Sequence, residues 1–227
     1  MSPAPTSSAD ARADLAALCA RGIDWRLDPS RTITLGTATR PAAVLVLFGR
    51  LDSSPAAASS APADIDVLLQ RRAGTLGHHA GQVAFPGGRL EPSDDGPVTA
   101  ALREAAEEVG LDASGVEVLG TLAALPVPVS DHLVTPVPAW WSQPSRVAAV
   151  DHAETVDVFR LAVADLIAPE NRASVAHTRA GATVRTPAFV VDDVLVWGFT
   201  AIVLSRMFDA LGWAVPWDTR RLVVPEV

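Results

Sequence analysis

One predicted helix, spanning residues 97–110, constrains this chain more than any other segment. Its apolar side chains form a stripe on one face, and Glu104, Glu107 and Glu108 project from the adjoining side. An α-helix turns by about 100° per residue, so Glu104 lies about 40° from Glu108 and about 60° from Glu107. The pattern therefore predicts a helix that packs on the core and carries three crowded carboxylates.

Two interpretations of the three carboxylates are open from the helix alone. Glutamate-rich helix faces are usually solvated. Alternatively, like charges one turn apart repel, and hard divalent cations with oxygen ligands are the natural partners that offset this repulsion. The segment Phe85-Pro86-Gly87-Gly88 lies upstream of the helix and favours the second interpretation.

Composition limits the classes of partner. The formal net charge of −8 argues against broad nucleic-acid binding, which needs a basic surface. Lysine is absent, so arginine supplies the permanent cations, and its planar group suits phosphate. Cys19 is the single cysteine, which excludes an intrachain disulfide and is consistent with a cytoplasmic protein. No membrane-spanning segment or signal peptide is expected.

The order of predicted elements favours an α/β fold with one mixed sheet between helices. Residues 1–8 are expected to be disordered, residues 9–227 to form a single domain, and residues 52–64 to form a long loop. Helices are predicted over residues 10–21, 97–110, 161–167 and 200–211. Strands are predicted over residues 42–48, 65–71, 82–85, 116–125, 132–141, 155–159, 175–177, 182–190 and 194–197. The first two strands are predicted to pair as a hairpin.

Residues 88–111 resemble the Nudix box, whose pattern is G-x5-E-x7-R-E-U-x-E-E-x-G-U with U a bulky aliphatic residue. The positions that match are Arg103, Glu104, Glu107, Glu108, Gly110 and Leu111. The upstream half departs from the pattern, because its loop is one residue longer and its Glu is replaced by Asp94 or Asp95, depending on the direction of counting. The resemblance implies a Nudix-type α/β/α sandwich and a metal-dependent pyrophosphohydrolase.

The stretch before the box resembles the coenzyme A pyrophosphatase branch of that family, in which it looks like L-L-T-x-R-[SA]-x3-R-x3-G-x3-F-P-G-G. The matching positions are Leu68, Leu69, Arg72, Ala73, Gly81 and residues 85–88. Gln70 replaces the Thr, and Gly77 replaces the second Arg. Segments at residues 154–159, 169–172 and 197–201 also look like this branch, so the resemblance covers roughly residues 40–210.

The resemblance implies a site for Mg²⁺ or Mn²⁺. Glu104 and Glu108 are the first-choice ligands and Glu107 the third. A backbone carbonyl at Gly87 or Gly88 would complete the set, since glycine lets the backbone approach an ion closely. Mg²⁺ keeps several of its waters, so a few carboxylates suffice.

Other roles are expected around these ligands. By resemblance Arg103 orients a box glutamate through a salt bridge; from sequence alone it is equally a surface arginine. The general base is either Glu107 or Glu154. The alternative for Glu154 is that it is only a surface charge at a strand edge, with no catalytic role. Asp94 and Asp95 are expected to be charges near the helix N-terminus, with metal contact the lesser option.

Substrate phosphates are expected to contact Arg72 and Arg89, with Gly87 and Gly88 lining the site. Arg71 is expected to point to solvent, because adjacent strand residues face opposite ways. His78 and His79 are interpreted as solvated, with phosphate contact as the lesser option.

The tryptophans are expected in the core. Trp197 is predicted to pack there, and of Trp140 and Trp141 at most one is predicted to face it, which leaves the other for stacking on a base.

Three functions are compatible with these residues. The first is hydrolysis of CoA or acyl-CoA to a phosphopantetheine moiety and adenosine 3′,5′-bisphosphate. The second, motivated by Gly77, is the same chemistry on ADP-ribose, NADH or a dinucleoside polyphosphate. The third is a catalytically silent nucleotide-sensing module. The expected partner is a CoA-like nucleotide, and the apolar segment 213–227 either covers its own domain or meets a second subunit in a possible homodimer.

Overall fold

The computed structural model describes most of the 227-residue chain: residues 10–25, 40–51, 62–73, 81–127, 130–153, 155–179 and 182–225. The predicted disordered segment 1–8 and most of the predicted loop 52–64 lie outside these residues. All statements on the fold concern the described ranges.

The larger sheet is mixed and has eight strands. They are β1 (Arg40–Arg50), β2 (Ile65–Arg72), β3 (Val83–Ala84), β4 (Gly87–Arg89), β5 (Val116–Val118), β6 (Leu125–Val127), β7 (His132–Trp141) and β8 (Thr155–Ala162). The strand β1 is central, since it runs parallel to β7 and antiparallel to β2 and β4. The antiparallel pairing of β1 with β2 confirms the predicted hairpin.

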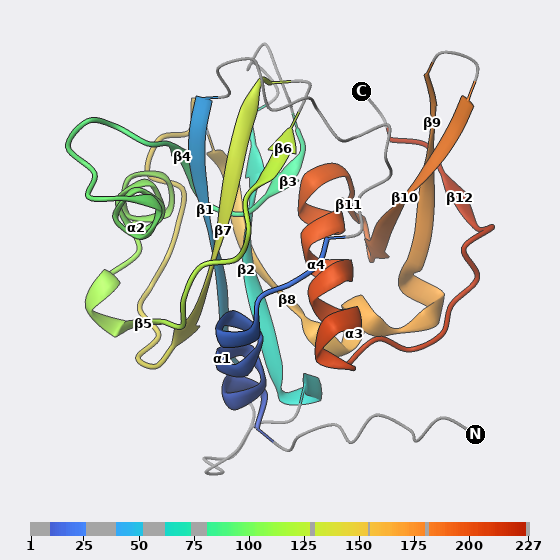
Figure 1. Cartoon of the computed structure of the whole chain (residues 1–227), viewed down its shortest axis with the longest axis horizontal. Coiled ribbons are helices and arrows are strands. Elements are labelled where there is room, and N and C mark those ends of the chain that lie inside the picture. The colour runs from blue at the N-terminus through green and yellow to red at the C-terminus, as the bar shows by residue number, and fades with distance from the viewer. Residues whose placement is uncertain are drawn as a thin grey trace.

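Helices cover both faces of this sheet, as Figure 1 shows. The α-helices are α1 (Ala11–Arg21), α2 (Pro97–Val109), α3 (Val163–Ile167) and α4 (Gly198–Leu211), and three short 3-10 turns are η2 (Pro62–Asp64), η3 (Ala113–Gly115) and η4 (Pro169–Asn171). Helix α2 packs on one face, while α1 and α4 pack on the other. The predicted α/β fold with a mixed sheet between helices is confirmed.

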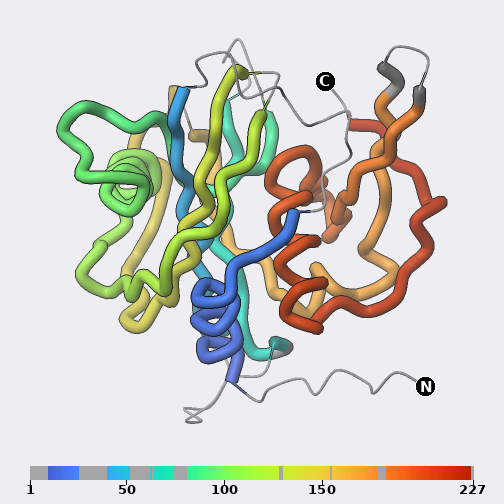
Figure 2. The backbone as a smooth tube through the Cα atoms, viewed as in Figure 1, coloured from blue at the N-terminus to red at the C-terminus, as the bar shows by residue number. Residues whose placement is uncertain are grey.

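A second, four-stranded sheet follows in the chain, whereas a single sheet was predicted. Its order is β11-β10-β9-β12, and its strands are β9 (Arg172–Arg179), β10 (Ala182–Val191), β11 (Val194–Val196) and β12 (Leu222–Val223). Figures 1 and 2 show this orange and red part of the chain beside the first sheet, with α4 between the two sheets in that view. Phe189, Val191 and Val196 of this sheet join the same core as β1.

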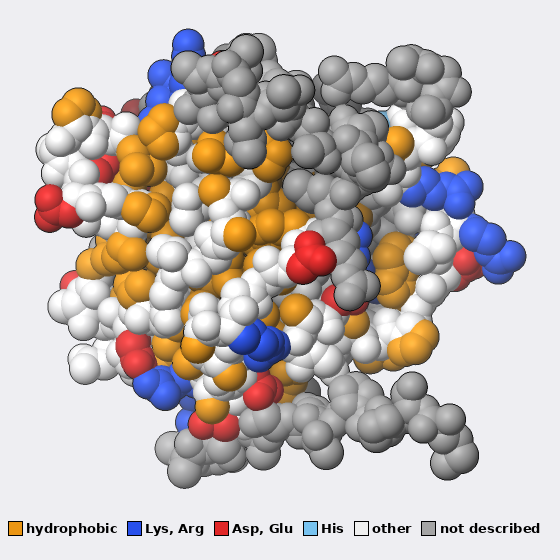
Figure 3. All heavy atoms as spheres, viewed as in Figure 1, with side chains coloured by type: hydrophobic (Ala, Val, Ile, Leu, Met, Phe, Trp, Pro, Cys, Tyr) orange, Lys and Arg blue, Asp and Glu red, His pale blue; other side chains and the backbone are white. Residues whose placement is uncertain are grey.

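Charged side chains of both signs are interspersed on the face of the molecule in Figure 3, mostly toward its rim. Among the described residues, no helix is both long and apolar enough to cross a membrane.

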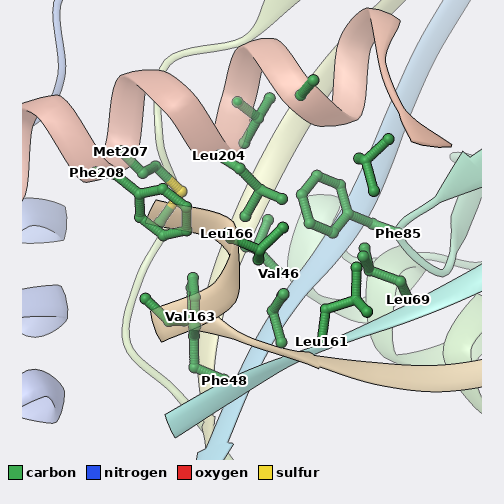
Figure 4. Packing of buried hydrophobic residues seen from close by; sticks show 14 of the residues in the cluster. Val46, Phe48, Leu69, Phe85, Leu161, Val163, Leu166, Leu204, Met207 and Phe208 are labelled. Atoms are coloured by element: carbon green, nitrogen blue, oxygen red, sulfur yellow. The ribbon is translucent and has the colours of Figure 1, made fainter. Parts of the chain in front are cut away.

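The core on the α4 side is built from strands and helices that are distant in sequence. Figure 4 shows Val46 and Phe48 of β1 facing Met207 and Phe208 of α4, with Leu166 of α3 between the layers. These side chains are buried. Burial of a large apolar side chain contributes about 1.5–3 kcal/mol, so this layer stabilises the sheet whose other face packs against α2.

Arg172 stabilises the second sheet from inside. Its side chain is fully buried, and its guanidinium carbon lies 4.5 Å from the ring centroids of both Phe189 and Trp217. It donates a hydrogen bond to Ser205 Oγ at 2.8 Å, and burial lowers its pKa to about 10. Cation–π contacts are stronger when desolvated, so the arginine joins β9 to the C-terminal segment.

The boundaries of several predicted elements are corrected. The predicted strand 116–125 is wrong as one strand, because β5 ends at Val118 and β6 begins at Leu125. Gly120 has φ 148° between them, and a Cβ there would lie 2.9 Å from Cys19 of α1. Strand β4 was not predicted, and the predicted helix 161–167 begins only at Val163. Predicted strand 175–177 extends over all of β9.

The tryptophans of β7 correct a second prediction. Both Trp140 and Trp141 are buried, on opposite faces of the sheet, and neither is left free to stack on a base. The prediction that at most one faces the core is wrong because helices cover both faces of the sheet, so side chains that point either way are buried. Trp197 is partly buried and stacks on His177 with ring centroids 6.3 Å apart.

Candidate functional site

The helix α2 forms where it was predicted and presents its carboxylates toward β4. Pro97 occupies the first helical turn, where proline is tolerated, and Gly110 ends the helix in the left-handed conformation, with φ 67°. The small side chains of Ala101 and Ala105 are fully buried against β1. This close packing brings the adjoining glutamates to the sheet.

Glu108 is the buried carboxylate of the site, with a side chain only 7% exposed. Its Oε2 accepts hydrogen bonds from Gln70 Nε2 at 2.6 Å and from the backbone N–H of Gly87 at 2.8 Å. Its Oε1 lies 3.7 Å from Arg72 Nη1. One oxygen is therefore held by two donors from β2 and β4, and the other faces a guanidinium.

Gln70 is a residue that sequence reasoning treated only as a departure from a motif. It is fully buried, and its Oε1 accepts a hydrogen bond from Thr155 Oγ1 at 2.9 Å. This contact fixes the amide so that Nε2 points at Glu108. The apolar run of β2 gave the only signal, since a glutamine inside a buried strand needs polar partners.

The electrostatics of Glu108 follow from its burial. Desolvation raises its pKa to about 7, against the opposing effects of Gly87, Gln70 and Arg72; the nearby carboxylate of Glu104 raises it slightly further. A buried carboxyl with a perturbed pKa beside a second carboxyl is typical of functional sites.

Glu104 lies directly under the glycine segment. A Cβ on Gly88 would lie within 2.5 Å of Glu104 Cδ, so only glycine leaves room for the carboxylate at its observed place. Burial raises the pKa of Glu104, and Arg103 opposes this effect.

Arg103 connects the predicted site residues. Its Nη1 lies 3.1 Å from Glu104 Oε1 and 3.0 Å from Glu107 Oε2, and its Nη2 donates to the carbonyl of Arg89 at 3.1 Å. Its Nη2 also lies 3.1 Å from Asp94 Oδ2, and the hydrogen bond to Asp94 raises its pKa. A solvated surface arginine is therefore the wrong interpretation.

Asp94 also differs from its prediction. Its side chain is 2% exposed and holds Arg103 instead of serving as a free charge at the start of the helix. The Arg103 hydrogen bond lowers the pKa of Asp94, and the backbone N–H of Glu91 donates to the same carboxylate at 2.8 Å. Asp95 is exposed.

The three box glutamates differ in their exposure to solvent. Glu104 and Glu108 converge beneath the glycine segment, whereas Glu107 is 60% exposed and contacts Arg103. Arg71 is partly exposed and lines a hollow of about 460 Å³ together with Trp197. Glu154, Gly77, His78 and His79 lie outside the described residues.

The donor set fits a hard divalent cation. In the described part of the chain no three carboxylate, imidazole or thiol groups gather into a cluster. Two carboxylates do converge, and the backbone of Gly87 and Gly88 lies against them. Mg²⁺ binds through one or two protein carboxylates and keeps several waters, so these residues suit it.

The raised pKa of Glu108 predicts how the stability of the metal-free protein depends on pH. A carboxyl whose pKa rises on folding stabilises the fold fully below its unfolded pKa of 4.5, and this contribution is lost as the pH rises through about 7. We expect Glu108→Gln to raise the free energy of unfolding in EDTA at about pH 8, by up to roughly 3 kcal/mol, and to give no such gain at about pH 4. Thermal unfolding checks this, and an equal effect at both pH values would contradict it.

Comparisons in sequence agree with the geometry. A sequence model of the NUDIX domain matches residues 54–178. An uncharacterized Nudix hydrolase, NudL, of Photorhabdus laumondii is 35% identical over 141 residues, which span 62% of this chain and 74% of that protein. The NudL protein of Yersinia pestis (strain Pestoides F) is 36% identical over 142 residues, which span 62% and 70%.

Solved structures show a looser likeness. The Nudix hydrolase RenU of M. smegmatis has a TM-score of 0.42 at 24% identity, over 55% of this chain and 71% of that one. The NUDIX domain of Shewanella oneidensis NrtR, complexed with ADP ribose, has a TM-score of 0.42 at 20% identity, over 62% and 80%. The sequence matches carry the assignment: this chain belongs to the NUDIX domain family and is a Nudix hydrolase.

Proposed function

We propose that this Nudix pyrophosphohydrolase cleaves the diphosphate bridge of CoA or acyl-CoA, giving a phosphopantetheine moiety and adenosine 3′,5′-bisphosphate. One observation carries the proposal. Two positions that match the CoA pyrophosphatase branch contact the buried carboxylate: Arg72 Nη1 lies 3.7 Å from Glu108 Oε1, and the backbone N–H of Gly87 donates to Glu108 Oε2. Gln70, which replaces the Thr of that branch, also contacts Glu108. We further propose a single domain over residues 9–227 and a cytoplasmic location.

In this proposal Glu104 and Glu108 hold Mg²⁺ or Mn²⁺, with Glu107 as a third ligand and a carbonyl at Gly87 or Gly88 completing the set. A bound divalent ion supplies neutralisation of the diphosphate charge and a water of lowered pKa. Arg103 keeps Glu104 and Glu107 in place through its two salt bridges.

Hydrolysis places the oxygen of water on one phosphorus, and the bridging oxygen leaves with the other. One proton of the water passes to a carboxylate base, for which Glu107 and Glu154 are both proposed. Arg72, whose Nη1 lies 3.7 Å from Glu108 Oε1, is the first proposed phosphate contact. Arg89, which follows Gly88 directly, is the second proposed phosphate contact.

A substrate panel tests the proposal. With Mg²⁺ or Mn²⁺, we expect kcat/KM for CoA to exceed that for ADP-ribose, NADH and diadenosine polyphosphates, because these lack the phosphopantetheine half. Mass spectrometry of the products identifies the cleaved bond. Efficient turnover of another member of the panel, with CoA left intact, would reject the proposed substrate and keep the chemistry.

Gly77 favours a second candidate within the same chemistry. The CoA branch carries an arginine where this chain has Gly77. Loss of that cation removes one phosphate contact, so another nucleoside diphosphate derivative is the alternative substrate that the same panel would identify.

A further inference from the structure

The two carboxylate oxygens of Glu108 have different surroundings, and Gln70 contributes to the difference. Oε2 accepts a hydrogen bond from Gln70 Nε2 at 2.6 Å and another from the backbone N–H of Gly87 at 2.8 Å. Oε1 accepts no hydrogen bond from the described residues, and Arg72 Nη1, at 3.7 Å, lies beyond hydrogen-bond distance. Glu108 therefore has one occupied oxygen and one available oxygen.

The occupied oxygen has no lone pair left for a cation. An ionised carboxylate offers about four lone-pair sites, two on each oxygen. The two donors on Oε2 use both of its sites, so a metal ion can bind Glu108 only through Oε1. Glu108 and Gln70 are both buried, so water does not readily replace a hydrogen bond that is broken there.

Thr155 fixes the direction of the Gln70 amide. Its Oγ1 donates to Gln70 Oε1 at 2.9 Å, which leaves the NH₂ end of the amide to face the carboxylate. Gln70 and Thr155 are buried and come from the paired strands β2 and β8. If the amide turned over, its oxygen would point at the oxygen of Glu108 and both hydrogen bonds would be lost.

The number of available oxygens bears on which divalent cation the site prefers. Ca²⁺ takes roughly six to eight oxygen ligands and binds carboxylates through one or both oxygens. Mg²⁺ demands near-octahedral geometry and keeps several waters. A carboxylate with one available oxygen therefore suits Mg²⁺ and withholds a ligand from Ca²⁺.

We propose that Gln70, held by Thr155, limits Glu108 to a single metal-binding oxygen and thereby favours Mg²⁺ over Ca²⁺. Gln70 and Thr155 are positioning residues, since they act through Glu108. The inference rests on the proposed function in one respect, that Glu108 is a metal ligand, and it deepens that function by assigning the choice of cation. The identity of the organic substrate does not enter.

Metal competition tests the inference without turnover. Displacement of bound Mn²⁺ by Mg²⁺ and by Ca²⁺, followed by the EPR signal of Mn²⁺, gives the ratio of Kd for Ca²⁺ to Kd for Mg²⁺. Gln70→Met keeps the length of the side chain and removes the donor. We expect it to lower this ratio by about tenfold, the scale of one hydrogen bond to a charged group.

Two variants of Thr155 separate positioning from stability. Thr155→Val keeps the shape of the side chain and removes the hydroxyl that holds Gln70, so the ratio should fall, by a smaller factor than in Gln70→Met. Thr155→Ser keeps the hydroxyl and should retain the wild-type ratio. The matched control is Thr186→Val, the same change at a buried threonine of the second sheet that is hydrogen-bonded to His177, which should leave the ratio unchanged.

An unchanged or higher ratio in both Gln70→Met and Thr155→Val would overturn the inference, as would a wild-type protein that binds no Mn²⁺. If Gln70→Met does not fold, Thr155→Val decides the question. A lower ratio supports the inference even if CoA is not cleaved, so failure of the proposed substrate and failure of the inference give different results.

Discussion

Glu108→Gln will lower kcat/KM by about 10²-fold or more, on the scale of losing one group that stabilises a transition state. The substitution preserves the shape of the side chain, and an amide oxygen can still accept the hydrogen bond of Gly87. It removes the negative charge beside Arg72 that a divalent cation requires. Steady-state turnover over a range of Mn²⁺ concentrations measures the loss, and a higher metal requirement should accompany it.

The matched control is Glu117→Gln, the same chemical change at an exposed glutamate that pairs with Arg12 far from the site. We expect this variant to retain wild-type turnover. If Glu108→Gln also kept full turnover while remaining folded, the assignment of Glu108 as a metal ligand would be wrong.

Gly88→Ala will reduce activity by about 10²-fold at nearly unchanged stability, whereas Gly87→Ala will unfold the protein more readily. A Cβ on Gly88 meets only the end of the flexible Glu104 side chain, which can swing away and leave the site. A Cβ on Gly87 meets the carbonyl of Ala43 and lies 2.6 Å from Val44 Cα, both part of the β1 backbone, and its φ of 154° disfavours other residues.

Thermal unfolding and turnover, measured on both variants, separate these effects. Each variant serves as the control for the other, because the two glycines are adjacent and receive the same methyl group. A Gly88→Ala protein with full activity would show that Glu104 need not occupy its observed position. A Gly87→Ala protein as stable as the wild type would show that β4 can move away from β1.

The helix of the site could be predicted from sequence because its information is local. Pro97, the apolar stripe and Gly110 lie within one stretch, and the structure confirms their roles in starting, packing and ending α2. The mixed sheet could be predicted from the order of strands and helices along the chain. The second sheet was missed, since strands read one at a time do not reveal which sheet they join.

The partners of the site residues could not be predicted, because they come from distant parts of the chain. Gln70 reaches Glu108 across 38 positions and Thr155 across 85. Asp94 belongs to the loop before α2, and its pairing with Arg103 depends on how that loop folds back. Burial of Trp140 and Trp141 on opposite faces also required knowledge of two covering layers.

The two donors on Glu108 Oε2 have a consequence for the order of assembly. They come from separate strands, and Gln70 is itself held by a third, so the carboxylate is fixed only once β2, β4 and β8 have closed around it. Before the chain has folded, the glutamate side chains are not held together and bind a divalent cation only weakly. A divalent cation should therefore bind only after folding and stabilise the folded state. Magnesium or manganese should then raise the melting temperature of the enzyme.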